Sequence, residues 1–173
     1  MSTNSVAGLT VRRPRETDQA RVLAVLDRWW GGFGGDDGSR QRALLLPRLF
    51  FQHFTTTSFL GEQQDGTIGA FLIGFLSQSD TDTAYIHFVG VAPELRGQGV
   101  AAALYSAFFD TARAHGRRYV HCVTSPGNSG SRAFHAALGF TEKPSENGSG
   151  EVHKDYDGPG LDRIVFVREL TDD

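Results

Sequence analysis

The sequence of 173 residues predicts an α/β fold of three layers with a mixed central sheet. The first observation is the order of the expected elements, β-α-α-β-β-β-α-β-α-β-β. The second is that residues 85–116 read as a strand, a glycine-containing turn and an Ala-rich amphipathic helix in direct succession. The third is the composition, 39% hydrophobic and 21% charged, which suffices for one domain with a substantial core. We therefore expect residues 1–173 to form a single domain.

The N-terminal part is expected to hold one strand and two helices. Residues 9–13 read as a strand, and a helix capped by Asp18 follows, because apolar residues then recur at helical spacing. Residues 31–38 are rich in glycine and are expected to form a mobile loop. A second helix is expected from Ser39 onward, kinked or split by Pro47.

Two strands, residues 57–62 and 67–78, are predicted next, joined by a hairpin turn at Asp65 and Gly66. The second strand is apolar on both faces, as a central covered strand should be. Simple alternation places Ile68 and Leu72 on one face and Phe71 and Ile73 on the other.

The strand at residues 85–91 leads through Arg96-Gly97-Gln98-Gly99 into a helix expected over residues 99–114. Gly97 and Gly99 have no Cβ, so the backbone can turn tightly and approach a ligand closely. The first N–H groups of the helix have no partner within it and carry the positive end of its dipole. Together with the cation of Arg96, the turn predicts a site for an anion such as a diphosphate.

The C-terminal part is expected to add a strand, a short helix and a final pair of strands. The strand covers residues 118–124, and the helix follows Asn128 and ends at Leu138 before Gly139. Residues 141–150 are polar and are expected to be loop. Residues 151–156 and 163–170 are expected to pair around a Gly-rich turn.

Charge and cysteine content exclude several classes of protein. A net charge of −3 and a pI near 6.0 argue against general binding of nucleic acid. The single Cys122 excludes a disulfide framework, and the histidines lack metal-ligand spacing, so no metal is expected. The N-terminal residues lack an apolar signal core, and no run approaches the roughly 20 apolar residues of a membrane span. We expect a soluble cytoplasmic protein with no membrane partner.

Two motifs resemble one known family. Residues 96–101, Arg-Gly-Gln-Gly-Val-Ala, resemble the acetyl-CoA signature (Arg/Gln)-x-x-Gly-x-(Gly/Ala) of the GNAT superfamily of N-acetyltransferases. Downstream, Asn128-x-x-Ser131-x-Ala133-Phe134-His135, followed by Gly139-Phe140, is similar to a second segment of that family. The element order agrees as well, so the resemblance covers essentially the whole chain. It implies the GNAT fold, with a mostly antiparallel sheet of about seven strands and about four helices.

The resemblance also implies an activity, transfer of the acetyl group of acetyl-CoA to a primary amine within a ternary complex. Backbone N–H groups of the turn would hold the diphosphate, and the strand before it would pair with the pantetheine arm. The implied cofactor-binding residues are Val89, Gly90, Val91, Arg96, Gly97, Gln98, Gly99, Val100, Ala101, Ala102, Asn128, Ser131 and Phe134. The family's sheet opens between the strands that correspond to residues 85–91 and 118–124. Family members are often dimers, so a homodimer is an expectation here.

The chemistry needs a base for the amine and a proton for the departing thiolate. An amine with a pKa of about 10.4 is neutral in only roughly 1 molecule in 2,500 at pH 7. His87 is our candidate base, because it shares a strand face with Tyr85, Val89 and Val91 and matches a position where relatives often carry Glu. A backbone N–H near Val91 is the candidate oxyanion donor. His135 stands where many relatives have a Tyr that protonates the thiolate, with Cys122 and Tyr156 as alternatives.

Each of these residues also has a purely structural interpretation. His87 can be a core histidine, His135 a packed helix residue, and Cys122 a small buried hydrophobe. Asn128 can serve only as a helix N-cap. The aromatic residues Trp29, Trp30 and Phe33 either line an acceptor pocket or belong to the core. The acids Asp155 and Asp157 either form a turn or bind a cationic acceptor. The acceptor can be a small amine, an amino acid, an antibiotic, or a lysine or N-terminus of a protein.

Two other functions compete with acetyl transfer. Gly97-x-Gly99-x-x-Ala102 fits the loose fingerprint of dinucleotide-binding oxidoreductases, but residues 119–123 lack the acid that should follow. The second alternative is a module that binds acetyl-CoA without catalysis. A nucleotide-hydrolysing P-loop is excluded because no Lys follows the glycine turn.

Overall fold

The structure, a computed structural model, describes residues 4–30, 35–146, 148 and 150–170. The chain divides into two compact units, one formed by Met1–Phe75 with Phe88–Thr111 and the other by Leu76–His87 with Ala112–Asp173. The helices are α1 (Asp18–Trp29), α2 (Gly35–Leu45), α3 (Leu49–His53), α4 (Val100–Ala114) and α5 (Ser129–Ala137), with short 3₁₀ turns η1 (Thr55–Thr57) and η2 (Pro93–Leu95). The strands are β1 (Asn4–Val6), β2 (Leu9–Arg12), β3 (Phe59–Glu62), β4 (Ile68–Leu76), β5 (Thr83–Val91), β6 (Tyr119–Thr124), β7 (Thr141–Glu142), β8 (Val152–His153) and β9 (Arg163–Glu169).

The α/β fold with a mixed sheet is confirmed. Hydrogen-bonded strands follow the order β1-β2-β3-β4-β5-β6-β9-β7, and β8 also pairs with β9. β5 and β6 run parallel, whereas β1–β2, β2–β3, β3–β4, β6–β9, β7–β9 and β8–β9 are antiparallel. The described strands number nine instead of about seven, because the very short β1 and β7 carry no pattern of their own in the sequence.

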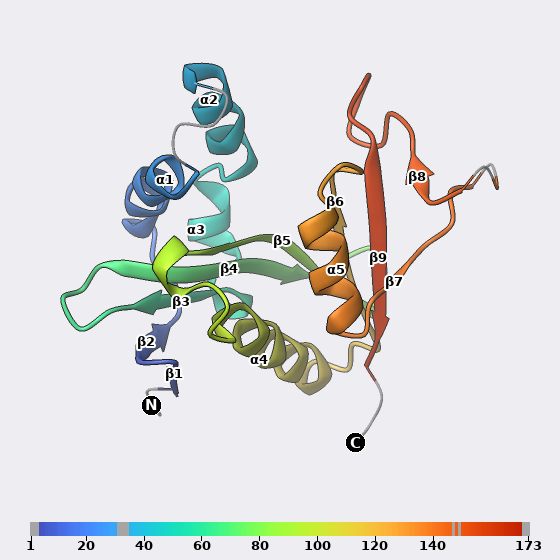
Figure 1. Cartoon of the computed structure of the whole chain (residues 1–173). Helices are drawn as coiled ribbons and strands as arrows, with labels where there is room; N and C mark the ends of the chain where they lie inside the picture. The colour runs from blue at the N-terminus through green and yellow to red at the C-terminus, as the bar shows by residue number, and fades with distance from the viewer. Residues whose placement is uncertain (1–3, 31–34, 147, 149, 171–173) are drawn as a thin grey trace. The chain divides into compact units, whose positions relative to one another are not determined.

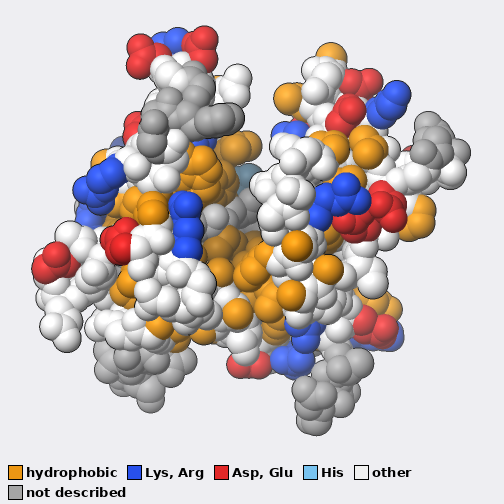
Figure 2. Space-filling view, viewed as in Figure 1, with side chains coloured by type: hydrophobic (Ala, Val, Ile, Leu, Met, Phe, Trp, Pro, Cys, Tyr) orange, Lys and Arg blue, Asp and Glu red, His pale blue; other side chains and the backbone are white. Residues whose placement is uncertain are grey.

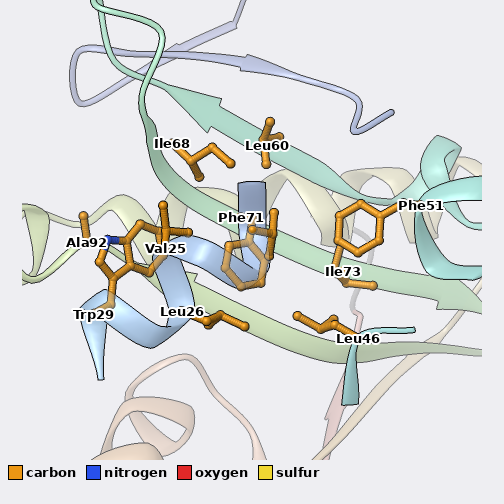
Figure 3. Packing of buried hydrophobic residues seen from close by; sticks show 11 residues of the cluster. Val25, Leu26, Trp29, Leu46, Phe51, Leu60, Ile68, Phe71, Ile73 and Ala92 are labelled. Carbon is orange, nitrogen blue, oxygen red and sulfur yellow. The ribbon is translucent and has the colours of Figure 1, made fainter. Parts of the chain in front are cut away.

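The first unit is built on β3 and β4, with α1 and α3 on one face and α4 on the other (Figure 1). Its core joins α1 to β3 and β4 (Figure 3) and contains Val22, Val25, Leu26, Trp29, Leu46, Phe51, Leu60, Ile68, Phe71, Ile73 and Ala92. The apolar residues that recur at helical spacing in α1 therefore form its buried face, as expected. Trp29 is a core residue that stacks on Phe71 with ring centroids 6.1 Å apart.

A bulge in β4 changes which of its side chains face α1. Gly61 of β3 pairs with Ala70, but the next residue, Glu62, pairs with Ile68, so Gly69 is an extra residue in the ladder. The extra residue turns Ile68 onto the face of Phe71 and Ile73, where all three join the α1 core. The expectation that Ile68 shares a face with Leu72 was therefore wrong.

The helix boundaries differ from the prediction at two places. Residues 35–38 were expected in a loop but form the first turn of α2, which begins at Gly35 and not at Ser39; residues 31–34 lie outside the described part. Within α2 no described side chain is buried. Pro47 separates α2 from α3, so the split alternative is confirmed.

Asp18 is the first residue of α1 and not its N-cap, which is Thr17. Its carboxylate accepts hydrogen bonds from the Arg12 and Arg21 guanidinium groups and from the backbone N–H of Arg15, at 2.7–2.9 Å. Glu62 of β3 joins the same cluster through both arginines. The side chain of Asp18 is only 2% exposed, so this cluster ties α1 to β2 and β3.

In the second unit, β9 is the central strand, paired with β6, β7 and β8. Its pairing with β8 confirms the expected final strand pair, whereas the expected loop at residues 141–150 contains β7. α5 packs on this sheet (Figure 1), and the His135 ring stacks on Phe166 of β9. Phe166 pairs with Cys122, so α5 covers the face that carries these two side chains.

On the face shown in Figure 2, Lys and Arg side chains are interspersed with Asp and Glu instead of gathering into one basic patch. No helix among the described residues is long and apolar enough to cross a membrane.

Candidate functional site

The turn between β5 and α4 presents a row of backbone donors. Within the described chain, no hydrogen-bond acceptor is assigned to the backbone N–H groups of residues 97–102. The first intrahelical bond comes later, from the Ala103 N–H to the Gly99 carbonyl at 3.0 Å. Six successive donors at a helix N-terminus fit a multiply charged anion.

The shape of this turn depends on its two glycines. Gly97 and Gly99 have φ angles of +74° and +78°, which side chains with a Cβ rarely adopt, and both are exposed. The Gln98 amide nitrogen donates to the Glu94 carbonyl at 2.8 Å and holds the turn in place. Arg96 Nε donates to the Val91 carbonyl at 3.1 Å, so the predicted cation lies at the end of β5.

Just before the turn, the backbone N–H and C=O groups of β5 point alternately toward β4 and away from it. The Ala92 N–H donates to the Gly69 carbonyl of β4 at 2.8 Å. Because successive residues of a strand direct their backbone groups to opposite edges, Val89 and Val91 present theirs away from β4. This orientation fits the predicted pairing with an extended ligand.

Gly90 lies between these two valines, on the face that packs against α1. A Cβ at this position would come within 2.6 and 2.8 Å of two ring atoms of Phe71 and 3.1 Å of Trp29. Phe71 is itself stacked with both Trp29 and Phe88, at centroid distances of 6.1 and 5.9 Å. Gly90 is therefore required by the packing behind the strand.

The parallel ladder between β5 and β6 is short. It joins Thr83, Ala84 and Tyr85 to Tyr119, Val120 and His121, although β5 continues to Val91 and β6 to Thr124. In the described chain no β5–β6 pair follows Tyr85 and His121. Within the second unit, the pairing of β5 with β6 therefore ends before His87.

In the second unit, α5 carries the other group of predicted residues. Asn128 caps the helix, its Oδ1 accepting the Ser131 N–H at 3.0 Å, so its structural interpretation is confirmed. His135 Nδ1 lies 2.7 Å from the Ser131 carbonyl and 3.2 Å from its hydroxyl. Since a carbonyl only accepts, Nδ1 carries a hydrogen and a neutral His135 has none on Nε2.

Comparison with known proteins identifies the family. The model of the acetyltransferase (GNAT) family matches residues 22–140, which include both motifs and the turn. The chain belongs to the GNAT family. This membership excludes a dinucleotide-binding oxidoreductase.

Curated relatives of this GNAT chain are acetyltransferases. An L-2,4-diaminobutyric acid acetyltransferase of Nocardia farcinica is 33% identical over 90 residues, 52% of this chain and 46% of the relative. A protein of the same name from Shouchella clausii is 28% identical over 90 residues, 52% of this chain and 50% of the relative. The aligned segments thus span about half the length of these relatives.

Solved structures show the same fold. The diaminobutyrate acetyltransferase of Paenibacillus lautus, solved with its substrate and coenzyme A, has a TM-score of 0.70 at 22% identity and covers 95% of this chain and 97% of its own. The ribosomal-protein-S18-alanine N-acetyltransferase of Escherichia coli has a TM-score of 0.66 at 19% identity, covering 95% and 96%.

The structure places the two predicted histidines of this GNAT chain on opposite faces of one sheet. His87 is half-buried, and strand alternation puts it on the same face as Tyr85 and opposite to Ile86. Tyr85 pairs with His121, so this face continues onto β6. His135 stacks on Phe166 on the other face, with ring centroids 4.4 Å apart. Both belong to the second unit, so this relation holds within one body.

The surroundings of His135 restrict its predicted role. It is only 6% exposed, with Phe134 and Phe140 edge-on to its ring. Burial lowers the pKa of His135, partly opposed by its hydrogen bond to Ser131. Because the Nδ1 hydrogen is held by the Ser131 carbonyl, His135 can donate a proton only from Nε2, and only when the ring is protonated. The proton-donor role therefore stays a prediction that requires the imidazolium form.

The alternative donors differ in their exposure. Burial raises the pKa of the Cys122 thiol well above its usual range, so this side chain stays a neutral thiol near pH 7. Tyr156 is 48% exposed and lies edge-on to His153. Trp30 lies edge-on to Phe88 and under the Arg96 guanidinium, whereas Phe33 lies outside the described residues.

The predicted residues thus fall into two groups. The first unit holds Val89–Val91 and the turn from Arg96 to Ala102, while the second holds His87 and the α5 residues. Strand alternation placed Tyr85 on the His87 face but assigned no role to its partly buried phenol. Burial first, and then the nearby Tyr156, Cys122 and Asp157, raise the pKa of Tyr85, so it stays a neutral phenol.

Proposed function

We propose that this GNAT protein transfers the acetyl group of acetyl-CoA to a primary amine of a small amino acid. The observation that carries the proposal is the row of six backbone donors at residues 97–102, which suits the diphosphate of coenzyme A. The backbone of Val89, Gly90 and Val91 would hold the pantetheine arm, and the Val91 N–H would serve the oxyanion. Asn128, Ser131 and Phe134 remain proposed coenzyme contacts.

The proposed chemistry is direct attack. His87 removes a proton from the acceptor ammonium and passes it to solvent. The neutral nitrogen then attacks the thioester carbon, the C–N bond forms as the C–S bond breaks, and the nitrogen gives its second proton to His87. The departing thiolate takes a proton from the His135 imidazolium. The products are an acetamide, free coenzyme A and one proton released to solvent, after His87 has given up its second proton and His135 has regained one.

The first candidate acceptor is L-2,4-diaminobutyrate. The two curated relatives named above carry this activity in their names, and the Paenibacillus lautus structure holds this substrate. The acceptor has an amine at the end of a short chain and an amino-acid head at the other end.

Calorimetric titration with acetyl-CoA tests the coenzyme half of the proposal, with NAD as the comparison ligand. Acetyl-CoA should bind in the micromolar range and NAD should not. Gly99→Ala should weaken acetyl-CoA binding about tenfold or more, because an L-residue is strained at φ +78° and its change displaces the donor row. Gly127→Ala is the matched control, since a Cβ there meets nothing within 4 Å and its φ is not positive. Equal affinities of both variants and the wild type would refute the assignment of the turn.

Thiol release measures the transfer half. Purified protein with acetyl-CoA and L-2,4-diaminobutyrate should release free thiol well above the rate without an amine. If the protein binds acetyl-CoA but none of the tested amines raises the rate of thiol release, it is a binding module and not an enzyme.

A further inference from the structure

The turn between β8 and β9 is held by two of its own carboxylates. The Asp155 N–H donates to Asp162 Oδ1 at 2.9 Å, and the Gly160 N–H donates to Asp155 Oδ1 at 2.6 Å. Asp155 has a φ of +51°, an uncommon conformation that these bonds stabilise. Asp155 and Asp162 are therefore occupied in shaping the turn.

Asp157, in the same turn, makes a different contact. Its Oδ2 lies 2.6 Å from Arg163 Nε, and the two side chains are 42% and 18% exposed. Arg163 also donates from Nη1 to the Asp162 carbonyl at 2.9 Å. Among the described residues, no partner is assigned to Asp157 Oδ1 or Arg163 Nη2. One carboxylate oxygen and one guanidinium nitrogen of the ion pair are thus available for another molecule.

This ion pair lies on the strand face that carries the candidate base. Along β9, Arg163 alternates onto the face of Val165 and Val167, and Val167 pairs with His121, the β6 partner of Tyr85. Tyr85 and His87 share that face of β5. The charges of Asp157 and Arg163 act in opposite directions on the pKa of Tyr85, which agrees with a position close to its phenol.

We propose that Asp157 and Arg163 bind the head of an α-amino acid acceptor, Asp157 its α-ammonium and Arg163 its carboxylate. In an α-amino acid these two groups are attached to the same carbon atom, and an adjacent carboxylate–guanidinium pair offers the opposite charges side by side. The remaining N–H groups of Arg163 can bind a carboxylate while Nε keeps Asp157 in place. The side-chain amine of the acceptor would then extend along the His87 face. The inference rests on the proposed acetyl transfer and adds the class of acceptor.

The test compares three acceptors that differ by one group. L-2,4-diaminobutyrate has both head groups, 1,3-diaminopropane lacks the carboxylate, and 4-aminobutyrate lacks the α-ammonium. Each charge-assisted contact should contribute about 10- to 100-fold to kcat/KM. The wild-type protein should therefore prefer diaminobutyrate over either analogue by about this factor, mainly through KM.

Variants then assign each contact to a residue. Arg163→Gln should abolish the preference for diaminobutyrate over 1,3-diaminopropane, and Asp157→Asn should abolish the preference over 4-aminobutyrate. Arg118→Gln is the matched control, because Arg118 forms an exposed ion pair, 3.7 Å long, with Glu169 at the other end of β9. This control should keep both preferences.

The exchange Asp157→Arg/Arg163→Asp separates recognition from turn stability. It retains an ion pair but reverses its polarity, so the preferences should stay lost. Recovery of both preferences in the double variant would overturn the inference, because the pair would then act only by holding the turn. Equal use of the three acceptors by the wild type would overturn it while leaving acetyl transfer intact. Transfer to none of them, with acetyl-CoA bound, would overturn the inference and the proposed function together.

Discussion

Replacing Gly90 by Ala tests whether the packing behind β5 is as tight as the structure indicates. The new Cβ would lie 2.6 and 2.8 Å from two ring atoms of Phe71 and 3.1 Å from Trp29. Carbon atoms prefer separations of about 3.5–4.0 Å, so the Phe71 ring would have to move by about 1 Å. The Trp29 and Phe88 rings are both stacked with Phe71 and restrict that shift.

The expected cost follows from two opposing effects. Overpacking a filled core destabilises by about 1–3 kcal/mol. Exchanging Gly for Ala at a compatible φ stabilises by about 0.4–1 kcal/mol, because the unfolded chain loses freedom. The free energy of unfolding should therefore fall by about 1–2 kcal/mol, which lowers Tm by roughly 2–8 °C for a chain of this length.

Urea denaturation measures this change as a shift of the midpoint at constant slope. Gly127→Ala, whose Cβ meets nothing within 4 Å, should stay within about 0.5 kcal/mol of the wild type. Phe71→Leu should relieve part of the clash, so the double variant with Gly90→Ala should be more stable than the two single changes predict together. A Gly90→Ala protein as stable as the wild type would refute the reasoning.

Three further predictions concern charged and titrating groups. Asp18→Asn should lower the free energy of unfolding by about 2 kcal/mol, because it removes one of the two carboxylates that bind Arg12 and Arg21 and leaves them only Glu62; a loss below about 0.5 kcal/mol in urea denaturation would contradict this. Burial alone would raise the pKa of Asp18, but the hydrogen bonds hold it at about 2. The contribution of this carboxylate to stability, roughly 2 kcal/mol, is therefore complete above pH about 4 and is lost as pH falls through about 2. Acid denaturation of the wild type and the variant measures this difference. His135→Phe should preserve the stack on Phe166 and lower kcat with little change in acetyl-CoA affinity, whereas a loss of affinity would make His135 a binding residue. Because burial lowers the pKa of His135 in the folded protein, the wild type should lose stability as pH falls below about 6.5, and the variant should not show this loss. His87→Ala should remove the acidic limb of the kcat/KM profile against pH, because a general base acts only while it is unprotonated, and an unchanged profile would eliminate it as the base.

Local signals account for the parts of the fold that the sequence predicted correctly. The β3–β4 hairpin follows from Asp65 and Gly66, whose turn has Gly66 at φ +81°. The ends of α4 and α5 follow from Gly116 and Gly139, both at positive φ. The donor row before α4 follows from its two glycines, because each of these signals acts within a few residues.

Features that depend on distant partners were missed. β1 and β7 are strands only because β2 and β9 pair with them. The bulge at Gly69 is visible only in the register against β3, so alternation placed Ile68 on the wrong face. Asp18 resembles a helix cap in sequence, but Arg12 on β2 and Glu62 on β3 determine its role. In the same way, the ion pair of Asp157 with Arg163 could not be separated in sequence from the acids that hold the turn.

The opposite placement of His87 and His135 limits where the two can act on one molecule. Neither side chain can pass through a paired part of the sheet, because the backbones of adjacent strands lie only about 4.8 Å apart. The β5–β6 ladder ends at Tyr85 and His121, and His87 lies beyond that end. A reacting atom accessible from both faces must therefore lie past the last pair. There the two histidines would have separate duties, so loss of one could not be compensated by the other, and the two single variants should affect opposite limbs of the pH–rate profile.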